Sequence, residues 1–396
     1  MEKSEIPHGG CPRAEYETAR LVLMHTPGEE VFCGAMHPAA ALYEKYMDVK
    51  RAGDEHRAYV EFLRNEAGAE VVTVREILER TETWELREFA SRFLTYSVRV
   101  LAAEDRAAAE EYRRETLGQM TKEELIRVIL LRPTLHLRRS VRNTGWKAEY
   151  ALRPLMNLFY MRDQMINTPR GPVIGRMNSE QRTEEADVAE FCLRQMGIRS
   201  VHRVRDEGAY LEGGDYIPFG DRAFIGTGLR TTQEAVEEMM REDVMGHDRV
   251  VVVRDRKCKQ NQMHLDTYFN VIDRDLATLG ANRLKAERGS DEWLTADVYE
   301  RNGGQGYRMT EEGVPFVEYL RREGVEIIPI NLRDELRYGN NYLTVSARRI
   351  VGVAGQSEEL RGMLAERGVR ADWLDLSELT HGYGAAHCMT QVIRRG

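Results

Sequence analysis

Hydrophobic and polar positions alternate in one unit that recurs along the chain. Apolar residues first follow the spacing of an amphipathic helix, a turn that usually contains glycine comes next, and a short run rich in β-branched residues follows. Glycine suits such a turn because it adopts the left-handed conformation at little cost. The unit therefore predicts a helix followed by a strand. Its five copies are YVEFLRNEAGAEVVTV at 59–74, VAEFCLRQMGIRSVHRV at 188–204, TQEAVEEMMREDVMGHDRVVVV at 232–253, FVEYLRREGVEIIPI at 316–330 and ELRGMLAERGVRADWLDL at 359–376.

Further strand candidates lie between these units, at 20–27, 221–228 and 342–355. Strands that alternate with helices are typical of an α/β fold. Five similar units favour a pseudo-fivefold repeat of supersecondary blocks. The pattern alone leaves a second interpretation open, because a helix, a glycine turn and a strand occur together in ordinary α/β proteins.

The segment 76–150 does not follow this pattern. It is rich in Ala, Glu, Arg and Leu and contains little glycine. Thr121 and Glu124 fit a capping box before an apolar helical run, and Pro133 is expected to end that helix. We therefore predict an all-helical insertion. The predicted domains are a catalytic α/β domain, formed by 1–75 and 151–396, and the insertion, formed by 76–150.

The composition is that of a soluble globular protein, with 31% charged and 42% hydrophobic residues. The formal net charge of −8 argues against a general nucleic-acid-binding protein, which needs a basic face. No apolar stretch reaches the roughly 18 residues that a membrane span requires. Residues 1–17 contain no apolar run, so we expect no signal peptide and a cytoplasmic location.

The five cysteines are widely spaced and include no CxxC pair. An odd count without paired spacing argues against a disulfide framework and against a structural zinc site. One of them, Cys388, follows small residues in the segment GYGAAHCMT. Small residues let backbone and substrate approach closely, yet a lone cysteine is more often a buried apolar residue than a nucleophile.

His264 and Asp266 are two residues apart in QMHLDTYFNVID. In an extended segment this spacing places both side chains on one face, where they can act on one small ligand. A metal site and a structural histidine are equally compatible with the pair. The remaining candidates are polar residues whose simple interpretation is a loop or a solvated charge. They are Asn157 and Asp163 in NLFYMRDQ, Arg182 in QRTEEAD, Glu212 and Asp215 in EGGD, and Arg230 at the end of a strand-like run.

In this order and spacing the segments resemble the guanidino-group-modifying enzymes, and most closely arginine deiminase. The shared motifs are an asparagine with an Arg-Asp pair, EGGD, MHLD followed by threonine, and a terminal glycine-rich HCM segment. The resemblance covers nearly the whole chain. It implies the pentein fold, a five-bladed, pseudo-symmetric α/β propeller, and a helical insertion after the first unit.

The resemblance also implies an activity, the hydrolysis of L-arginine to L-citrulline and ammonia through a covalent thiouronium on Cys388. His264 would protonate the departing ammonia and then activate water, while Glu212 would orient His264. Asp163 and Asp266 would hold the guanidinium through charge-assisted hydrogen bonds.

Substrate-binding roles follow from the same resemblance. Arg182 and Arg230 would clamp the α-carboxylate with help from Asn157. Asp215 would lie behind these groups or near the α-ammonium. No metal and no organic cofactor is implied. The expected partner is a small guanidino substrate, without nucleic acid or membrane, and a homo-oligomer is compatible with the sequence.

The C-terminal segment departs from the family's pattern. Tyr383 stands five residues before the nucleophile, where the family usually has an arginine, and Gly384, Ala385 and Ala386 only partly match its glycines. NLFYMRDQ also differs from the more usual FTRD. The exact guanidino substrate therefore stays open.

Other functions compete with this interpretation. An amidinotransferase would use the same cysteine, histidine and carboxylates but pass the amidino group to an amine. A deiminase or dihydrolase for a modified arginine is a second alternative. A non-catalytic arginine-binding relative is disfavoured, because binding alone needs no nucleophile, and a metal-dependent hydrolase is more distant still.

Overall fold

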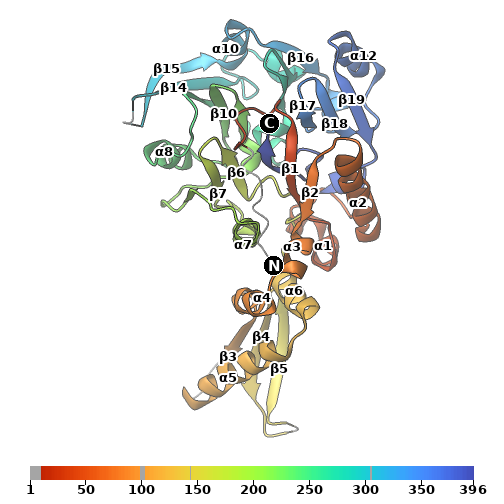
Figure 1. Cartoon of the computed structure of the whole chain (residues 1–396), viewed down its shortest axis with the longest axis vertical. Helices are drawn as coiled ribbons and strands as arrows, with labels where there is room; N and C mark the ends of the chain where they lie inside the picture. The colour runs from red at the N-terminus through yellow and green to blue at the C-terminus, as the bar shows by residue number, and fades with distance from the viewer. Residues whose placement is uncertain (1–9, 99–102, 143, 304–305) are drawn as a thin grey trace.

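The computed structural model describes residues 10–98, 103–142, 144–303 and 306–396. The chain forms a mixed α/β body from which an appendage projects at one end (Figure 1). The predicted α/β class is therefore confirmed. Within these residues, no helix combines the length and the apolar character that crossing a membrane requires.

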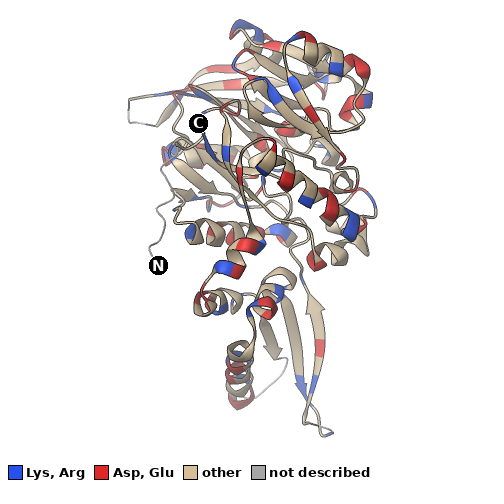
Figure 2. Cartoon of the chain, turned by 45° about the vertical axis from the view of Figure 1, so that its right-hand side comes forward, with Lys and Arg blue, Asp and Glu red and all other residues tan. Residues whose placement is uncertain are grey.

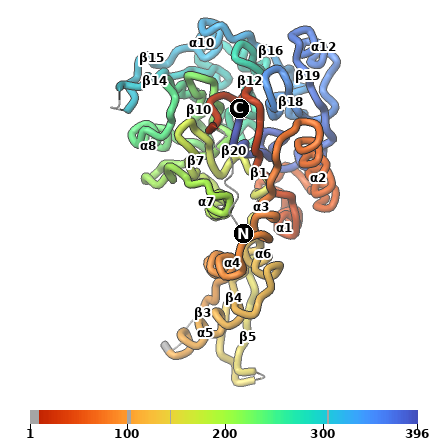
Figure 3. The backbone as a smooth tube through the Cα atoms, in the orientation of Figure 1, coloured from red at the N-terminus to blue at the C-terminus, as the bar shows by residue number. Residues whose placement is uncertain are grey.

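Five sheets in the body share one plan. In each, a middle strand pairs antiparallel with one neighbour and parallel with another, and a helix lies in the parallel connection. In the first sheet β1 (Ala19–Met24) pairs parallel with β2 (Glu70–Thr73) and antiparallel with β20 (Gln391–Arg395). The final strand of the chain thus lies beside the first strand, as the tube in Figure 3 shows.

The other four sheets repeat this arrangement further along the chain. Their strands are β6 (Met165–Thr168), β7 (Gly171–Ile174) and β8 (His202–Arg203); β9 (Tyr216–Phe219), β10 (Arg222–Thr227) and β11 (Arg249–Arg254), extended by β14 (Thr295–Arg301) and β15 (Tyr307–Pro315); β12 (Phe269–Asp273), β13 (Leu276–Gly280) and β16 (Glu326–Ile330); and β17 (Leu343–Ser346), β18 (Arg349–Val353) and β19 (Arg370–Leu374). The connecting helices are α2 (Val49–Asn65), α7 (Glu185–Gln195), α8 (Gln233–Arg241), α10 (Phe316–Arg322) and α12 (Glu358–Glu366).

All five predicted helix–turn–strand units form, and the turn of each contains a glycine in the same backbone conformation. The glycine in every turn has a positive φ, between 68° and 77°. Side chains other than glycine rarely adopt this conformation, so glycine lets the chain reverse directly into the parallel strand. These glycines are Gly68, Gly197, Gly246, Gly324 and Gly368.

The appendage is not all-helical, and that prediction was wrong. It contains a three-stranded sheet in the order β3 (Thr95–Val98), β4 (Pro133–Arg139) and β5 (Trp146–Leu152). Its helices are α4 (Thr83–Ala90), α5 (Ala103–Gln119) and α6 (Lys122–Leu131).

Two predicted local signals in the appendage are nevertheless present. Thr121 and Glu124 form the capping box of α6, and α6 ends two residues before Pro133. Pro133 then opens a strand instead of a loop. Apolar residues of β4 and β5 alternate with period two and so share one sheet face, a pattern that the helix-rich composition obscured.

The apolar core of the appendage continues into the body. Helix α3 (Val74–Arg80) contacts both α6 and α7. One buried cluster joins Leu23 of β1, Leu78 of α3, Ile129 of α6 and Leu193 of α7. The division into a catalytic domain and an insertion at 76–150 stays a prediction. Three short helices complete the body, α1 (Glu29–Ala35), α9 (Ala281–Leu284) and α11 (Leu332–Glu335).

Candidate active site

Most of the predicted site residues line one small cavity in the body. They come from loops that are far apart in the sequence but lie at the ends of neighbouring sheets. The cavity has room for about one water molecule. Its lining consists of Leu42, Asn157, Tyr160, Asp163, Arg182, Arg230, Gln260, Met263, His264, Tyr383, Gly384 and Cys388.

Cys388 lies in a tight turn just before β20. Its Sγ is 3.2 Å from Nδ2 of Asn341, which donates to the sulfur, and Oδ1 of Asn341 accepts from the backbone N–H of Cys388 at 3.3 Å. Small residues are needed here, because a Cβ on Gly384 would come within 2.6 Å of the Tyr160 ring and 3.0 Å of Cys388 Cβ. The turn is therefore held by its partners as well as by its own backbone.

The Cys388 thiol is neutral in this environment. Burial raises its pKa well above the ordinary value, and the charges of Asp266 and Asp163 raise it further. The hydrogen bond from Asn341 acts in the opposite direction but is weaker. A cation that entered the cavity would offset the two carboxylates and favour the thiolate.

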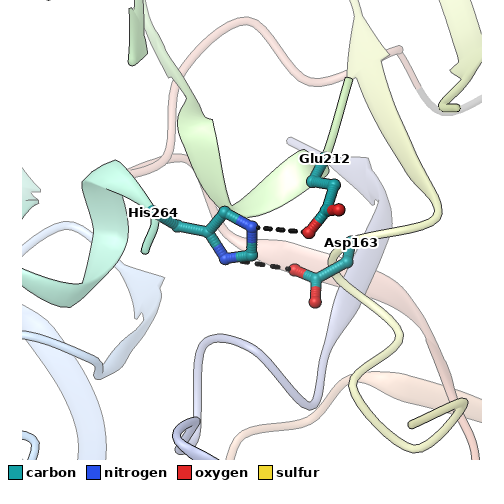
Figure 4. Close-up of side chains that lie close together, drawn as sticks. All are labelled: Asp163, Glu212 and His264. Carbon is teal, nitrogen blue, oxygen red and sulfur yellow. Dashed lines mark hydrogen bonds and ion pairs between the residues drawn. The ribbon is translucent and has the colours of Figure 1, made fainter. Parts of the chain in front are cut away.

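His264 lies between two carboxylates (Figure 4). Its Nε2 donates to Glu212 Oε2 at 2.9 Å, and its Nδ1 is 3.6 Å from Asp163 Oδ1. Burial alone would lower the pKa of His264, but Asp163, then Glu212 and Asp215, raise it to about 9. The imidazole is therefore protonated at neutral pH and can donate a proton.

The EGGD segment reaches His264 because its two central residues lack side chains. A Cβ on Gly214 would lie 2.7 Å from Nδ1 of His264, and one on Gly213 would overlap the carbonyl oxygen of Arg162. Glu212 at the start of this segment is fully buried. Burial raises its pKa, but the hydrogen bond and charge of His264, followed by Arg230, lower it to about 2. Glu212 is thus a fixed negative charge against the imidazolium.

Asp163 and Asp266 each present one free oxygen. Oδ2 of Asp163 accepts from Arg182 at 2.8 Å, and Oδ2 of Asp266 accepts from Nδ1 of His387 at 2.6 Å. The Oδ1 atom of each is buried and makes no hydrogen bond to the described residues. Asp266 Oδ2 is also 3.5 Å from Sγ of Cys388. Buried anionic oxygens without donors are costly, so the site is prepared for a cationic ligand with several N–H groups.

The two predicted clamp arginines are buried instead of solvated. Arg182 is held by Asp163 and by Glu185, at 2.9 Å, and these carboxylates raise its pKa despite burial. Arg230 is held more loosely, by a 3.0 Å bond to Gln260 and a 4.0 Å contact with Glu212. Nε of Arg230 has no hydrogen-bond partner in the described part of the chain.

Asn157 and Asp215 occupy different environments. Asn157 lines the cavity and anchors it, because its amide donates to the carbonyl oxygen of Ala41 at 2.9 Å. Asp215 lies behind the cavity and accepts from the backbone N–H of Leu265 at 2.9 Å. Burial raises the pKa of Asp215 to about 7. Whether Asp215 supports the site or contacts the α-ammonium stays a prediction.

Two residues that contact Cys388 or Asp266 received no role from the sequence. Asn341 gave no signal, because GNNY reads as an ordinary loop before a strand. His387 was visible beside Cys388 but received no role. It is fully buried, with Nδ1 on Asp266 and Nε2 3.3 Å from Glu15. Only the fold shows that these side chains lie against the sulfur and its neighbouring carboxylate.

Three of the polar groups have the spacing of a metal site. Ligand atoms of Asp163, Glu212 and His264 lie within 4.8 Å of one another. The three groups are already paired with one another, because His264 donates to Glu212 and lies 3.6 Å from Asp163. Arg182 already supplies positive charge to Asp163 and approaches Glu212 at 3.9 Å. The prediction that no metal takes part stays a prediction.

Comparison with known proteins gives a consistent result. The family model described as arginine deiminase matches residues 40–395. An arginine deiminase of Halobacterium salinarum is 23% identical over 475 aligned positions, with 96% of each chain covered. One of Limosilactobacillus fermentum is 25% identical, covering 96% of this chain and 97% of that protein.

Solved structures share the fold at lower identity. The N-terminal domain of ArgZ, described as an arginine dihydrolase from cyanobacteria, matches with a TM-score of 0.57 and 13% identity over 95% of this chain and 97% of that one. AgrE matches with a TM-score of 0.58 and 13% identity over 95% of this chain, which spans only 39% of AgrE. These structural neighbours are of the pentein type.

Proposed function

Since the chain belongs to the arginine deiminase family, we propose that it hydrolyses L-arginine to L-citrulline and ammonia with Cys388 as nucleophile. The observation that carries this proposal is a pair of buried carboxylates near a buried thiol. Oδ1 of Asp163 and Oδ1 of Asp266 make no hydrogen bond to the described residues, and Oδ2 of Asp266 lies 3.5 Å from Sγ of Cys388. A guanidinium is planar and cationic, and its N–H groups can satisfy both oxygens at once.

We also propose that the five sheets of the body form the blades of a pseudo-symmetric propeller. Their shared strand plan and the pairing of β20 with β1 support this arrangement. The ends of neighbouring sheets would then meet around one centre, where the cavity lies. Such a fold would bring side chains from loops that are distant in the sequence to one place, even when each loop is short.

The first chemical step removes ammonia. The guanidinium offsets the charges of the two carboxylates, so the thiol of Cys388 gives up its proton to solvent and the thiolate attacks the guanidinium carbon. A new C–S bond forms and one C–N bond breaks. The protonated His264 gives its proton to the departing nitrogen, leaving a neutral imidazole and a thiouronium.

The second step adds water. Neutral His264 takes a proton from water, the hydroxide adds to the thiouronium carbon, and the C–S bond breaks to return the thiolate. The thiolate takes up the remaining hydroxyl proton and becomes the neutral thiol again, and the proton released in the first step converts ammonia to ammonium in solution, so atoms and charge balance. Glu212 supports both steps because its charge stabilises the imidazolium that each cycle regenerates.

Recognition of the amino-acid end falls to Arg230, Arg182 and Asn157, which line the same cavity as the thiol. Arg230 is the more available of the two arginines, because Arg182 is already bound by two carboxylates. The cavity must widen to admit arginine. Gln260, Met263 and Tyr383 are the lining residues whose side chains would move.

The experiment is an incubation with L-arginine, with and without glycine as amine acceptor, followed by mass spectrometry of the products. Citrulline and ammonia without an acceptor would support the deiminase. Ornithine formed only with the acceptor would establish an amidinotransferase. Absence of turnover in both would overturn the choice of substrate and direct attention to Tyr383, which stands in the cavity where an arginine was expected.

A further inference from the structure

Strand β5 of the appendage has an unpaired edge. The sheet order is β3-β4-β5, so β4 covers one edge of β5, and no other described strand pairs with the second edge. Figures 1 and 2 both show β5 at the border of the appendage, on the far side from α5. A free edge of seven residues is an exposed row of backbone donors and acceptors, which proteins normally cover or disrupt.

This edge also exposes an apolar face. Trp146, Ala148, Tyr150 and Leu152 alternate along β5 and share one side of the sheet. Tyr150 is 75% exposed and Leu152 is 49% exposed. At the opposite edge α5 packs against β3, so the covered and uncovered parts of the sheet are clearly separated.

We propose that β5 pairs antiparallel with β5 of a second copy of this chain, about a twofold axis through Ala148. The two appendage sheets would join into one sheet of six strands. In this register Lys147 faces Glu149 of the second copy, and Glu149 faces its Lys147. Trp146 likewise lies opposite Tyr150 of the second copy, twice across the axis. Opposite charges and paired aromatic rings are the side-chain combinations that stabilise neighbouring antiparallel strands.

Neighbouring registers lack these features. An axis through Lys147 places the two lysines opposite each other, and an axis through Glu149 does the same with the glutamates. An axis between residues would place the apolar face of one strand beside the polar face of the other. Of the registers centred on Lys147, Ala148 and Glu149, only the one centred on Ala148 pairs opposite charges.

The charged residues are available for this contact. Lys147 has no ion-pair partner among the described residues. Glu149 has a long contact with Arg138, 3.7 Å between two exposed side chains, which contributes little in water. In a second copy, Lys147 and Glu149 would each find an oppositely charged partner next to the hydrogen bonds that join the two strands. The pairing is independent of the chemistry at Cys388.

Sedimentation of four forms of the full chain tests the proposal. We expect a concentration-dependent dimer for the unchanged chain. Lys147→Glu and Glu149→Lys each create two like-charge pairs and should weaken association about tenfold. The double variant restores opposite charges and should dimerise again. An equal mixture of the two single variants should form a heterodimer.

Each result decides the question, and far-UV circular dichroism with thermal unfolding verifies that every variant is folded. A monomer at all concentrations would overturn the proposal, and so would a dimer that neither single variant weakens. Failure of the double variant to recover association would show that the register is wrong.

A cross-link tests the same register by geometry. Facing residues of antiparallel strands have Cα atoms about 4.5–5.5 Å apart, which suits a disulfide. Ala148→Cys should therefore give a covalent dimer on a non-reducing gel. Ala151→Cys and the unchanged chain are controls, because Ala151 lies far from its own copy across the axis. Equally fast cross-linking of the Ala151 variant would contradict the proposed pairing.

Discussion

Two groups on opposite sides of the buried carboxylates, His264 and Cys388, hold their protons for different reasons. On one side His264 is enclosed by Asp163 and Glu212, and these negative charges stabilise its positive form. On the other side Cys388 is buried next to Asp266 and Asp163, and the same kind of charge stabilises its neutral form. The same surplus of negative charge therefore keeps His264 protonated and Cys388 neutral. We propose that the positive charge of the bound substrate offsets this surplus and allows the thiolate to form.

The largest expected effect comes from removing the sulfur. Cys388→Ala should lower kcat by at least about 10⁴-fold, because no other group can form the covalent intermediate. Thermal unfolding measured with turnover would show whether the protein remains folded. Cys258→Ala is the matched control, since Cys258 is exposed, and it should retain full activity. If the Cys388 variant turned over arginine near the normal rate, Cys388 would not be the nucleophile.

Asp266→Asn separates the two roles of the carboxylate. It should lower kcat/KM for arginine by about 10–100-fold, because one charged hydrogen bond to the guanidinium is lost. In the absence of substrate the same change should lower the pKa of Cys388 and speed its alkylation by iodoacetamide, because a neighbouring negative charge is gone. Slower alkylation would contradict the stated origin of the inactive thiol.

The next largest effect is expected from the two arginines predicted to bind the α-carboxylate of the substrate. Arg230→Ala should raise KM for arginine by about 30-fold, while KM for agmatine, which lacks the carboxylate, changes little. Arg182→Ala should also lower the free energy of unfolding, because Glu185 and Asp163 then lose a buried cation. Equal effects of Arg230→Ala on both substrates would show that Arg230 does not bind the carboxylate.

The protonation of His264 predicts that both turnover and stability depend on pH. Because His264 must carry a proton for ammonia to leave, kcat should fall about tenfold per pH unit above the pKa of about 9. The raised pKa also stabilises the fold. This contribution is fully present below the unfolded value of about 6.5 and is lost as pH rises through about 9. Unfolding measured from pH 6 to pH 10 should show this loss in the unchanged chain and not in His264→Asn.

The smallest effect is expected at Asn341. Asn341→Ala removes the donor to Sγ and should raise the pKa of Cys388, slowing turnover about tenfold. Asn341→Asp keeps the acceptor for the backbone N–H groups of Ala385 and Cys388 but replaces the donor with a charge. It should therefore shift the pH dependence of iodoacetamide alkylation further upward. If the two variants alkylate identically, Asn341 only shapes the turn.

The sequence predicted the body of the molecule better than the appendage. The helix–turn–strand units were predictable because the turn of each contains a glycine with a positive φ, which other residues rarely adopt, as Gly68 and Gly324 show. The strands β4 and β5 were missed because their alternation is short and follows a long helix rich in alanine and glutamate. Local sequence propensity predicts a strand poorly where its pairing with other strands decides whether it forms.

Within the site, residue types were predictable and their partners were not. Glu212 and His264 stand in short motifs, so their chemistry is visible in the sequence. Their pKa values of about 2 and about 9 depend on burial and on contacts across 52 residues of chain. Asn341 stands 47 residues before Cys388 and reaches its sulfur only in the folded chain, so no spacing rule would have found it.

The central claim is that arginine forms a covalent bond with Cys388 beside the two carboxylates. Its most direct test is rapid-quench mass spectrometry of the intact protein during turnover of L-arginine, followed by peptide mapping. We expect a transient adduct on Cys388 whose mass equals arginine less ammonia, and no adduct in Cys388→Ala. Turnover at the normal rate with no adduct at any time, or an adduct on another residue, would contradict it.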